Sequence, residues 1–282
     1  MQKIFLHGWN YRDQPFELAA RRAREFGFDG IEAYPGHYSH PDNPLASQKE
    51  LKAIAESEGM KLAVGSLQMD TTTDDEAARR ETLASLGDYV AALAELDFDL
   101  INGWISPLSS PSGSYHDSGS AMATDAHYDR AIEASSLIAQ AAEAAEIDVV
   151  FELHMNMLHD TVRSALRIIE AVGSPRLKVN YDPANMHGYD HAEPPDEAVK
   201  AAAPYLAYAH LKNCRRFGRD TDYHYPLRTG DLDYSIILRD MYNTGFRGPY
   251  GLEYSGAGDR NAQTKEDYDY LRGLLDEIEA EG

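Results

Sequence analysis

The sequence predicts an α/β fold, a (β/α)8 TIM barrel, from two observations. Short apolar runs rich in β-branched and aromatic residues alternate with longer amphipathic stretches through the whole chain. Eight such strand-helix units follow one another, and parallel strands joined by helical crossovers close most economically into a barrel with its helices outside. With 282 residues, 43% of them hydrophobic, the chain suits one large barrel, and we predict a single domain over residues 1–282.

The predicted strands begin near Ile4, Gly30, Lys61, Leu100, Val149, Leu177, Leu206 and Tyr250. Apolar residues at helical spacing predict helices over residues 16–26, 48–57, 75–96, 125–145, 161–172, 195–203, 232–242 and 265–278. Two long connections, residues 107–124 and 214–230, follow the fourth and seventh strands. Both leave the strand ends at which barrel active sites lie, so we expect them to form lids or binding loops.

The charge balance excludes some classes of partner. The formal net charge is −21, from 47 acidic and 26 basic residues, whereas a nucleic-acid-binding surface has to be cationic. The sequence has no apolar run long enough to cross a bilayer and no signal-peptide pattern at its start. A single cysteine, Cys214, allows no intrachain disulfide, so we expect a cytoplasmic protein. The acidic, lysine-poor composition also suggests a halophilic host, a hypothesis that salt-independent stability would contradict.

Four successive predicted strands end in a side chain that can bind a metal. These are Glu152, Asp182, His210 and Glu253, and His154 shares a strand face with Glu152. A carboxylate within an apolar run is costly unless it is paired or metal-bound, and in a barrel these strand ends meet at one mouth. Any one of them alone is more simply a hydrogen-bonded interior residue. Together, at equivalent places in four consecutive units, they predict a site for one divalent ion, Mn²⁺, Mg²⁺, Co²⁺ or Zn²⁺.

At this point the sequence resembles the xylose isomerase-like TIM barrels, also called the sugar phosphate isomerase/epimerase superfamily. The resemblance lies in residues 30–32 (GIE), 151–154 (FELH), 182–185 (DPAN), 209–213 (AHLKN), 226–233 (PLRTGDLD), 245–248 (GFRG) and 251–253 (GLE). It implies that Glu152, Asp182, His210 and Glu253 are the metal ligands, and that the two glutamates are the acid/base pair of the family's ketose 3-epimerases. A dimer or tetramer fits the same resemblance.

The resemblance also implies roles for residues around the metal, and two departures from the epimerases. His154 matches a histidine of the fifth strand in many members, and Arg216 matches an arginine that contacts substrate in the epimerases. The epimerases place a histidine where this chain has Asn185, and a glutamate where it has Leu158. These two positions weaken the comparison with ketose 3-epimerases, but they leave the predicted metal ligands unchanged.

The chemistry expected of such a site is proton transfer next to a carbonyl group. A metal that chelates a carbonyl and its neighbouring hydroxyl acidifies the α-hydrogen and stabilises an enediolate. With Glu152 and Glu253 as the catalytic pair, return of the proton gives epimerisation or isomerisation, and loss of a β-hydroxyl gives dehydration. Further substrate-binding candidates are His7, Trp9, Glu32, Trp104, His154, Asn185 and Arg216.

We therefore expect a metal-dependent isomerase or epimerase for a sugar or another small polyhydroxy carbonyl compound. Three other hypotheses about the function compete with this one. A dehydratase of the same family, of the inosose or dehydroshikimate type, is the first alternative. A non-enzymatic binding barrel should lack ligands, and all four are present. An endonuclease of this fold would need a basic groove, which the net charge opposes. Two roles remain open for Glu32: it could hydrogen-bond a substrate hydroxyl or orient His7. Two also remain open for Lys212: it could neutralise a substrate anion or form an ion pair with a carboxylate of the barrel.

Overall fold

The computed structural model, which describes residues 1–254, 256 and 258–281, confirms the predicted barrel. Parallel strands close in the order β1-β10-β7-β6-β5-β4-β3-β2. Their bounds are β1 (Ile4–His7), β2 (Gly30–Glu32), β3 (Leu62–Met69), β4 (Leu100–Ile105), β5 (Val149–Glu152), β6 (Leu177–Tyr181), β7 (Leu206–Leu211) and β10 (Tyr250–Leu252). Each begins within one residue of its predicted start. The continuous burial of these strands explains why they stand out as apolar runs in the sequence.

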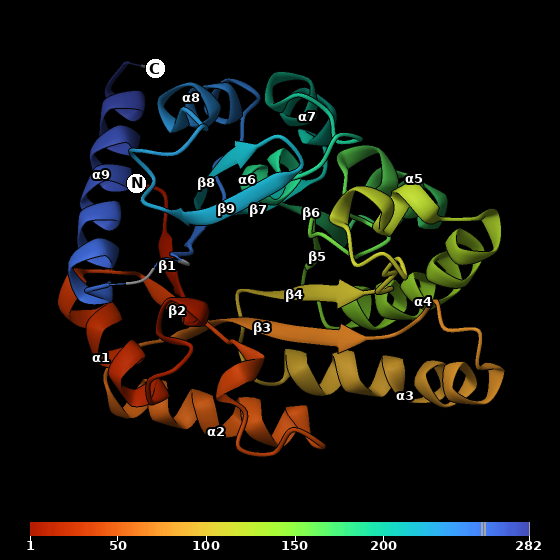
Figure 1. Ribbon diagram of the computed structural model, residues 1–282. Coiled ribbons are helices and arrows are strands. Elements are labelled where there is room, and N and C mark those ends of the chain that lie inside the picture. The colour runs from red at the N-terminus through yellow and green to blue at the C-terminus, as the bar shows by residue number, and fades with distance from the viewer. Residues whose placement is uncertain (255, 257, 282) are drawn as a thin grey trace.

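Helices surround the barrel (Figure 1). They are α1 (Phe16–Phe26), α2 (Pro44–Ser57), α3 (Glu76–Ala94), α4 (Asp125–Ala144), α5 (Val162–Val172), α7 (Pro195–Ala202), α8 (Tyr234–Asn243) and α9 (Arg260–Glu281), with a short α6 (Pro183–His187) after β6. Local signals fix their ends: the Thr161 hydroxyl caps α5, and Gly173, with φ of 71°, ends it. α2 begins earlier than predicted, because Pro44 is its first residue and the Asn43 side chain caps it.

The connection over residues 214–230 contains a β-hairpin that the sequence analysis did not predict. β8 (Asn213–Phe217) and β9 (Asp220–Tyr225) pair antiparallel, and Gly218 occupies the turn with φ of 67°. Its strands are largely polar and partly exposed, so they lack the apolar alternation by which strands are recognised. In Figure 1 the hairpin lies across the barrel beside α6.

The second long connection, after β4, packs against this hairpin. It includes two 3-10 turns, Tyr115–Asp117 and Gly119–Met122. The His116 ring nitrogen Nε2 lies 2.9 Å from the Arg219 carbonyl oxygen, and the Arg219 guanidinium is 3.2 Å from Asp117. These contacts join the two connections over the carboxyl-terminal ends of the strands.

Below these connections the barrel is filled by apolar side chains. One buried cluster consists of Phe5, Ala63, Val64, Leu100, Val150 and Tyr208, all from barrel strands. A larger one lies between the strands and the helices. The polar residues predicted as ligands therefore stand at the open end of a closed core. Among the described residues, no helix is long and apolar enough to cross a membrane.

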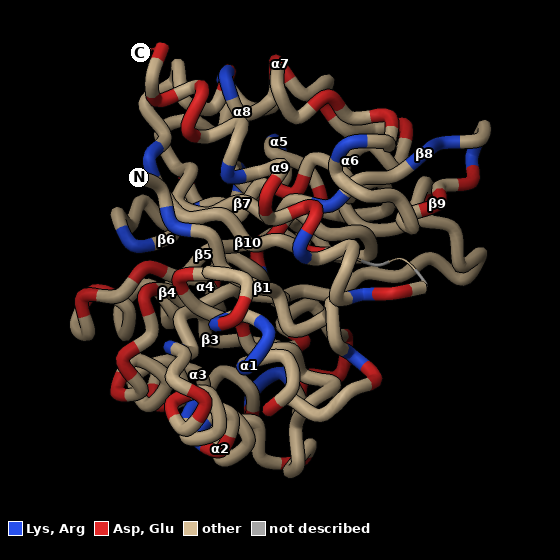
Figure 2. The backbone as a smooth tube through the Cα atoms, turned by 90° about the vertical axis from the view of Figure 1, so that its left-hand side faces the viewer, with Lys and Arg blue, Asp and Glu red and all other residues tan. Residues whose placement is uncertain are grey.

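The acidic excess lies on the outside of the molecule. Figure 2 shows Asp and Glu along α2, α3, α7 and α9, with Lys and Arg between them, and basic residues in the hairpin around β8. Ion pairs tie many of these side chains together, such as Arg21 with Glu58 at 2.9 Å. Exposed pairs of this kind add little stability individually.

One buried carboxyl group makes the stability of the fold depend on pH. Asp267 of α9 is 3% exposed and accepts a hydrogen bond from the Leu227 backbone nitrogen at 3.0 Å, which ties the segment after β9 to the last helix. Burial raises the pKa of Asp267 from 3.8 to about 7. Because the folded chain then holds this proton more tightly than the unfolded chain, the free energy of unfolding falls as the pH rises between those two values.

We expect Asp267→Asn to stabilise the protein more at pH 8 than at pH 5, by a difference on the order of 2 kcal/mol. The amide oxygen keeps the bond from Leu227 and carries no charge to desolvate. Urea unfolding of the variant and the wild type at the two pH values measures this difference. Asp269→Asn removes the same charge from the exposed side of α9 and is the control. An equal effect of Asp267→Asn at both pH values would contradict the prediction.

Candidate metal centre

The structure brings the four predicted ligands together at the carboxyl-terminal end of the barrel. Glu152 ends β5, Asp182 follows β6, His210 lies in β7 and Glu253 follows β10. One ligand atom from each lies within 4.8 Å of the others, and none of the four residues is more than 8% exposed. Parallel pairing of the strands sets this meeting point, since Gly251 is opposite His210 and places the end of β10 beside the end of β7.

Hydrogen bonds fix the orientation of two of the ligands, Asp182 and His210. The Asp182 side chain caps α6 by accepting from the Asn185 backbone nitrogen at 2.9 Å, and its other oxygen, Oδ2, lies 2.8 Å from Lys212 Nζ. The imidazole of His210 lies between two carboxylates: Nε2 is 2.8 Å from Glu32 Oε2, and Nδ1 is 3.1 Å from Glu152 Oε1. Glu32 thus selects the tautomer with hydrogen on Nε2.

The donor set passes a direct test for a metal. His210 Nδ1 is buried and makes no hydrogen bond of acceptable geometry with any described residue, although Glu152 and Glu253 oxygens lie 3.1 and 3.9 Å away. A buried nitrogen lone pair without a donor is costly unless something binds it. Three carboxylates and one imidazole form the mixed oxygen and nitrogen set that divalent Mn, Mg, Co or Zn ions accept. The residues present therefore fit the predicted ion.

A polar layer inside the barrel, formed by Glu32, Asn102, Asn180 and Tyr208, supports these ligands from below. The Tyr208 hydroxyl donates to Glu32 Oε2 at 2.7 Å. Asn102 Nδ2 donates at 3.0 Å both to Glu32 Oε1 and to Glu152 Oε2, and Asn180 Nδ2 donates to Asn102 Oδ1 at 3.2 Å. The layer links Glu152 of β5 to His210 of β7 through Glu32 of β2, so a change in one of its members should disturb both ligands.

The electrostatics of the site require cations. Burial is the largest cause that raises the pKa of Asp182, and the carboxylates of Glu253 and Glu152 raise it further. Burial alone would also raise the pKa of Glu152, but His210 outweighs it and the pKa lies well below its ordinary value. For His210, the carboxylates of Glu32 and Glu152 likewise outweigh burial and raise the pKa. A divalent ion would relieve the repulsion that Asp182 experiences.

Lys212 also belongs to this site. Its ammonium nitrogen lies 2.8 Å from Asp182 Oδ2 and 2.8 Å from Glu253 Oε2. Of its two interpretations from sequence, the ion pair with a carboxylate is the one the structure contains. The signal was the spacing of two residues from His210, which puts both side chains on one face of the strand.

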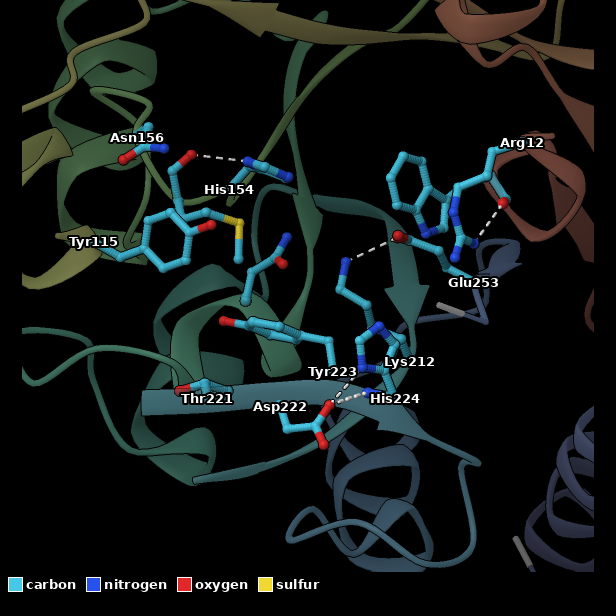
Figure 3. A pocket seen from close by; sticks show the side chains of 13 residues that line it. Arg12, Tyr115, His154, Asn156, Lys212, Thr221, Asp222, Tyr223, His224 and Glu253 are labelled. Atoms are coloured by element: carbon cyan, nitrogen blue, oxygen red, sulfur yellow. Dashed lines mark hydrogen bonds and ion pairs between the residues drawn. The ribbon is translucent and has the colours of Figure 1, made fainter. Parts of the chain in front are cut away.

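A cavity of about 360 Å³ opens above the ligands (Figure 3). Its walls include Glu253 and Lys212 from the metal centre and Tyr115, Thr221, Tyr223 and His224 from the two long connections. In Figure 3, Tyr115 and His154 lie across the cavity from Glu253. Both connections thus contribute walls to this cavity.

The predicted substrate-binding residues divide into three groups. Trp9, His154 and Asn185 line the cavity. The Asn185 side-chain oxygen is buried and has no hydrogen-bond partner among the described residues. Arg216 faces a neighbouring cavity instead and pairs with Asp190.

The other three lie below or beside the ligands. Glu32 is 1% exposed, and its Oε2 lies 2.8 Å from His210 Nε2. The Nε2 atom of His7 is farther from Glu32, at 3.8 Å from Oε1. Trp104 Nε1 donates a hydrogen bond to Glu152 Oε2, and its ring lies 4.4 Å from that of His154. These positions suit orientation of the ligands better than contact with a substrate.

Sequence reasoning missed one further residue that holds the site. His159 is fully buried, and its two ring nitrogens lie 2.7 Å from the carbonyl oxygens of Glu152 and Ile105. It therefore joins the ends of β5 and β4, next to the catalytic candidate Glu152. No strand pattern marks it, because it lies in a connection whose contacts only the fold reveals.

The family model described as the xylose isomerase-like TIM barrel matches residues 20–274. The chain belongs to this family. No curated protein matches it by sequence.

Solved structures of this family are similar over nearly the whole chain. A D-psicose 3-epimerase from Clostridium cellulolyticum H10, solved with D-tagatose, is 19% identical with a TM-score of 0.76, over 97% of this chain and 99% of that one. The probable 3-DHS dehydratase AsbF from Bacillus anthracis is 19% identical with a TM-score of 0.72, over 96% and 98%. A xylose isomerase-like TIM barrel protein from Mycobacterium smegmatis, in complex with magnesium, is 20% identical with a TM-score of 0.72, over 99% and 98%. At these identities the similarity establishes the fold.

We expect Glu32→Gln to weaken binding of Mn²⁺ by about tenfold or more, because the amide no longer holds hydrogen on His210 Nε2 by charge. Calorimetric titration of the metal-depleted protein measures the affinity. Glu50→Gln, an exposed carboxylate of α2, is the control. Unchanged affinity in Glu32→Gln would show that Glu32 does not orient the ligand.

Proposed function

We propose that this protein is a divalent-metal-dependent isomerase or epimerase of a sugar or a similar small polyhydroxy carbonyl compound. The observation that carries the proposal is the convergence of Glu152, Asp182, His210 and Glu253, with Nδ1 of His210 3.1 Å from Glu152 Oε1, beneath a cavity of about 360 Å³. A cavity of this size suits a monosaccharide-sized ligand. The epimerase among the similar structures supports the same class.

In the proposed mechanism, the bound metal would withdraw electrons from the carbonyl and hydroxyl oxygens of the substrate. Glu152 and Glu253 come from strands on different sides of the barrel, so their carboxylates approach a substrate from two directions. One removes the α-proton, leaving an enediolate, and the other, once protonated, returns a proton to the opposite face or to the neighbouring carbon. Asn185 and Lys212, which line the cavity, would orient the hydroxyls.

A dehydratase is the second candidate. Asn185 and Leu158 replace the histidine and glutamate that the resemblance to ketose 3-epimerases leads us to expect, and Leu158 is fully buried, away from the cavity. Among the similar structures is a probable dehydratase. Assays on candidate ketoses and on cyclic hydroxy ketones separate the two, because dehydration gives a conjugated product with new ultraviolet absorbance and epimerisation does not.

Other features of the chain remain proposals. We propose that residues 1–282 act as one domain, that the partner is a small sugar-like molecule and neither nucleic acid nor membrane, and that the protein forms a dimer or tetramer. Its composition further supports a cytoplasmic location and a halophilic host.

We expect the purified protein to hold about one divalent ion per chain after incubation with Mn²⁺, Mg²⁺, Co²⁺ or Zn²⁺, and Asp182→Ala to lose it, because one charged ligand is gone. Elemental analysis measures the content. Asp190→Ala removes a carboxylate outside the ligand set and should keep the metal. No metal in the wild type under all four conditions would refute the metal centre.

We expect Glu152→Gln and Glu253→Gln each to lower turnover by about a hundredfold or more while the fold persists, since the amide cannot exchange a proton. The measurement is turnover of the best ketose or aldose substrate with saturating metal, with circular dichroism to check the fold. Glu193→Gln, a carboxylate away from the metal centre, is the control. Near-normal turnover in either variant would remove that residue from the acid/base pair.

A further inference from the structure

The ammonium group of Lys212 lies where a cation is expected to bind. Lys212 follows His210 by two residues, and its Nζ contacts Asp182 Oδ2 and Glu253 Oε2 at 2.8 Å each. The residue is 5% exposed, so water screens these contacts little. Asp182 and Glu253 are two of the four proposed metal ligands.

The other hydrogen-bond donors in the described part of the site make no hydrogen bond with Asp182 Oδ2 or Glu253 Oε2. Glu152 Oε2 accepts hydrogen bonds from the neutral groups of Asn102 and Trp104. For Asp182 Oδ2 and Glu253 Oε2, Lys212 is the one hydrogen-bond donor among the described residues. The lysine therefore neutralises the two ligands that the polar surroundings do not.

We propose that Lys212 is an internal competitor of the metal, whose ammonium group occupies Asp182 and Glu253 and is displaced when a divalent ion takes them as ligands. The inference rests on the proposed metal centre. Two like charges held by the same pair of buried carboxylate oxygens repel each other strongly. Metal binding must therefore break the Lys212 contacts, and the affinity is lower than the four ligands alone would give.

The structure offers the displaced group a place to go. Lys212 lines the cavity above the ligands, and Figure 3 shows its side chain reaching toward Glu253 from the cavity wall. A rotation of its flexible side chain would leave the ammonium facing the substrate. The same contacts explain how the carboxylates can stay buried when metal is scarce, since an unpaired buried charge is strongly destabilising.

A second interpretation of the same contacts gives the opposite expectation. If Lys212 acted as a brace that holds Asp182 and Glu253 in position for the metal, its removal would weaken metal binding. The sign of the change in affinity therefore decides between competitor and brace.

The test is calorimetric titration of metal-depleted protein with Mn²⁺. Lys212→Met keeps the length of the side chain without the charge, and Lys212→Gln keeps a hydrogen-bond donor without the charge. Both should bind Mn²⁺ about tenfold more tightly than the wild type or better. Lys200→Met removes the same charge from the exposed face of α7, where Lys200 pairs with Asp196, and should leave the affinity unchanged.

Thermal unfolding gives a second readout that does not depend on activity. In EDTA, Lys212→Met should melt several degrees below the wild type, whereas in saturating Mn²⁺ the difference should disappear or reverse. If Lys212→Met cannot be obtained without metal, competition with a chelator of known affinity gives the same comparison, and Lys212→Gln repeats it. Equal or weaker Mn²⁺ binding in both variants, with normal binding in the wild type, would overturn the proposal and leave the metal centre intact. A wild type that binds no metal would instead overturn both.

Discussion

Four carboxylates buried in one end of a barrel are the constraint on which the rest of this structure depends. Glu32, Glu152, Asp182 and Glu253 are all at most 8% exposed. His210 contacts Glu32 and Glu152, and the Lys212 ammonium contacts Asp182 and Glu253. Such a cluster is stable only when its charges are compensated and its lone pairs are filled. The polar layer, the orientation of His210 and the position of Lys212 each compensate part of this buried charge.

The barrel satisfies the requirement by geometry rather than by local structure. Parallel strands in register carry successive side chains to the same depth, so Asn102 and Tyr208 meet Glu32 from 70 and 176 residues away in sequence. Asn180 likewise meets Asn102, 78 residues before it. Because these polar groups are fixed by a closed sheet, they can hold a charged ligand set without rearrangement. This is the preorganisation that catalysis by electrostatic stabilisation needs.

The walls of the cavity come mostly from other parts of the chain than the candidate ligands. The ligands come from strand ends, whereas the outer wall of the cavity comes from the connection after β4 and from the β8–β9 hairpin, which meet through His116, Arg219 and Asp117. Connections of this kind can vary in length and sequence without disturbing the barrel. They allow one metal chemistry to serve many substrates in a fold of this kind.

The sequence by itself determined the barrel and its four metal-ligand candidates. Buried strands are recognisable as apolar runs, and a carboxylate or histidine inside such a run, as at Glu253 or His210, is conspicuous because its burial needs a reason. The tertiary structure alone decided what surrounds them. The hairpin lacks apolar alternation, His159 lies in a connection, and Arg216 turns toward Asp190, so neither periodicity nor motif indicates their contacts. The partners of Glu32 and Lys212 come from distant strands, and only closure of the barrel brings those charges within hydrogen-bonding distance.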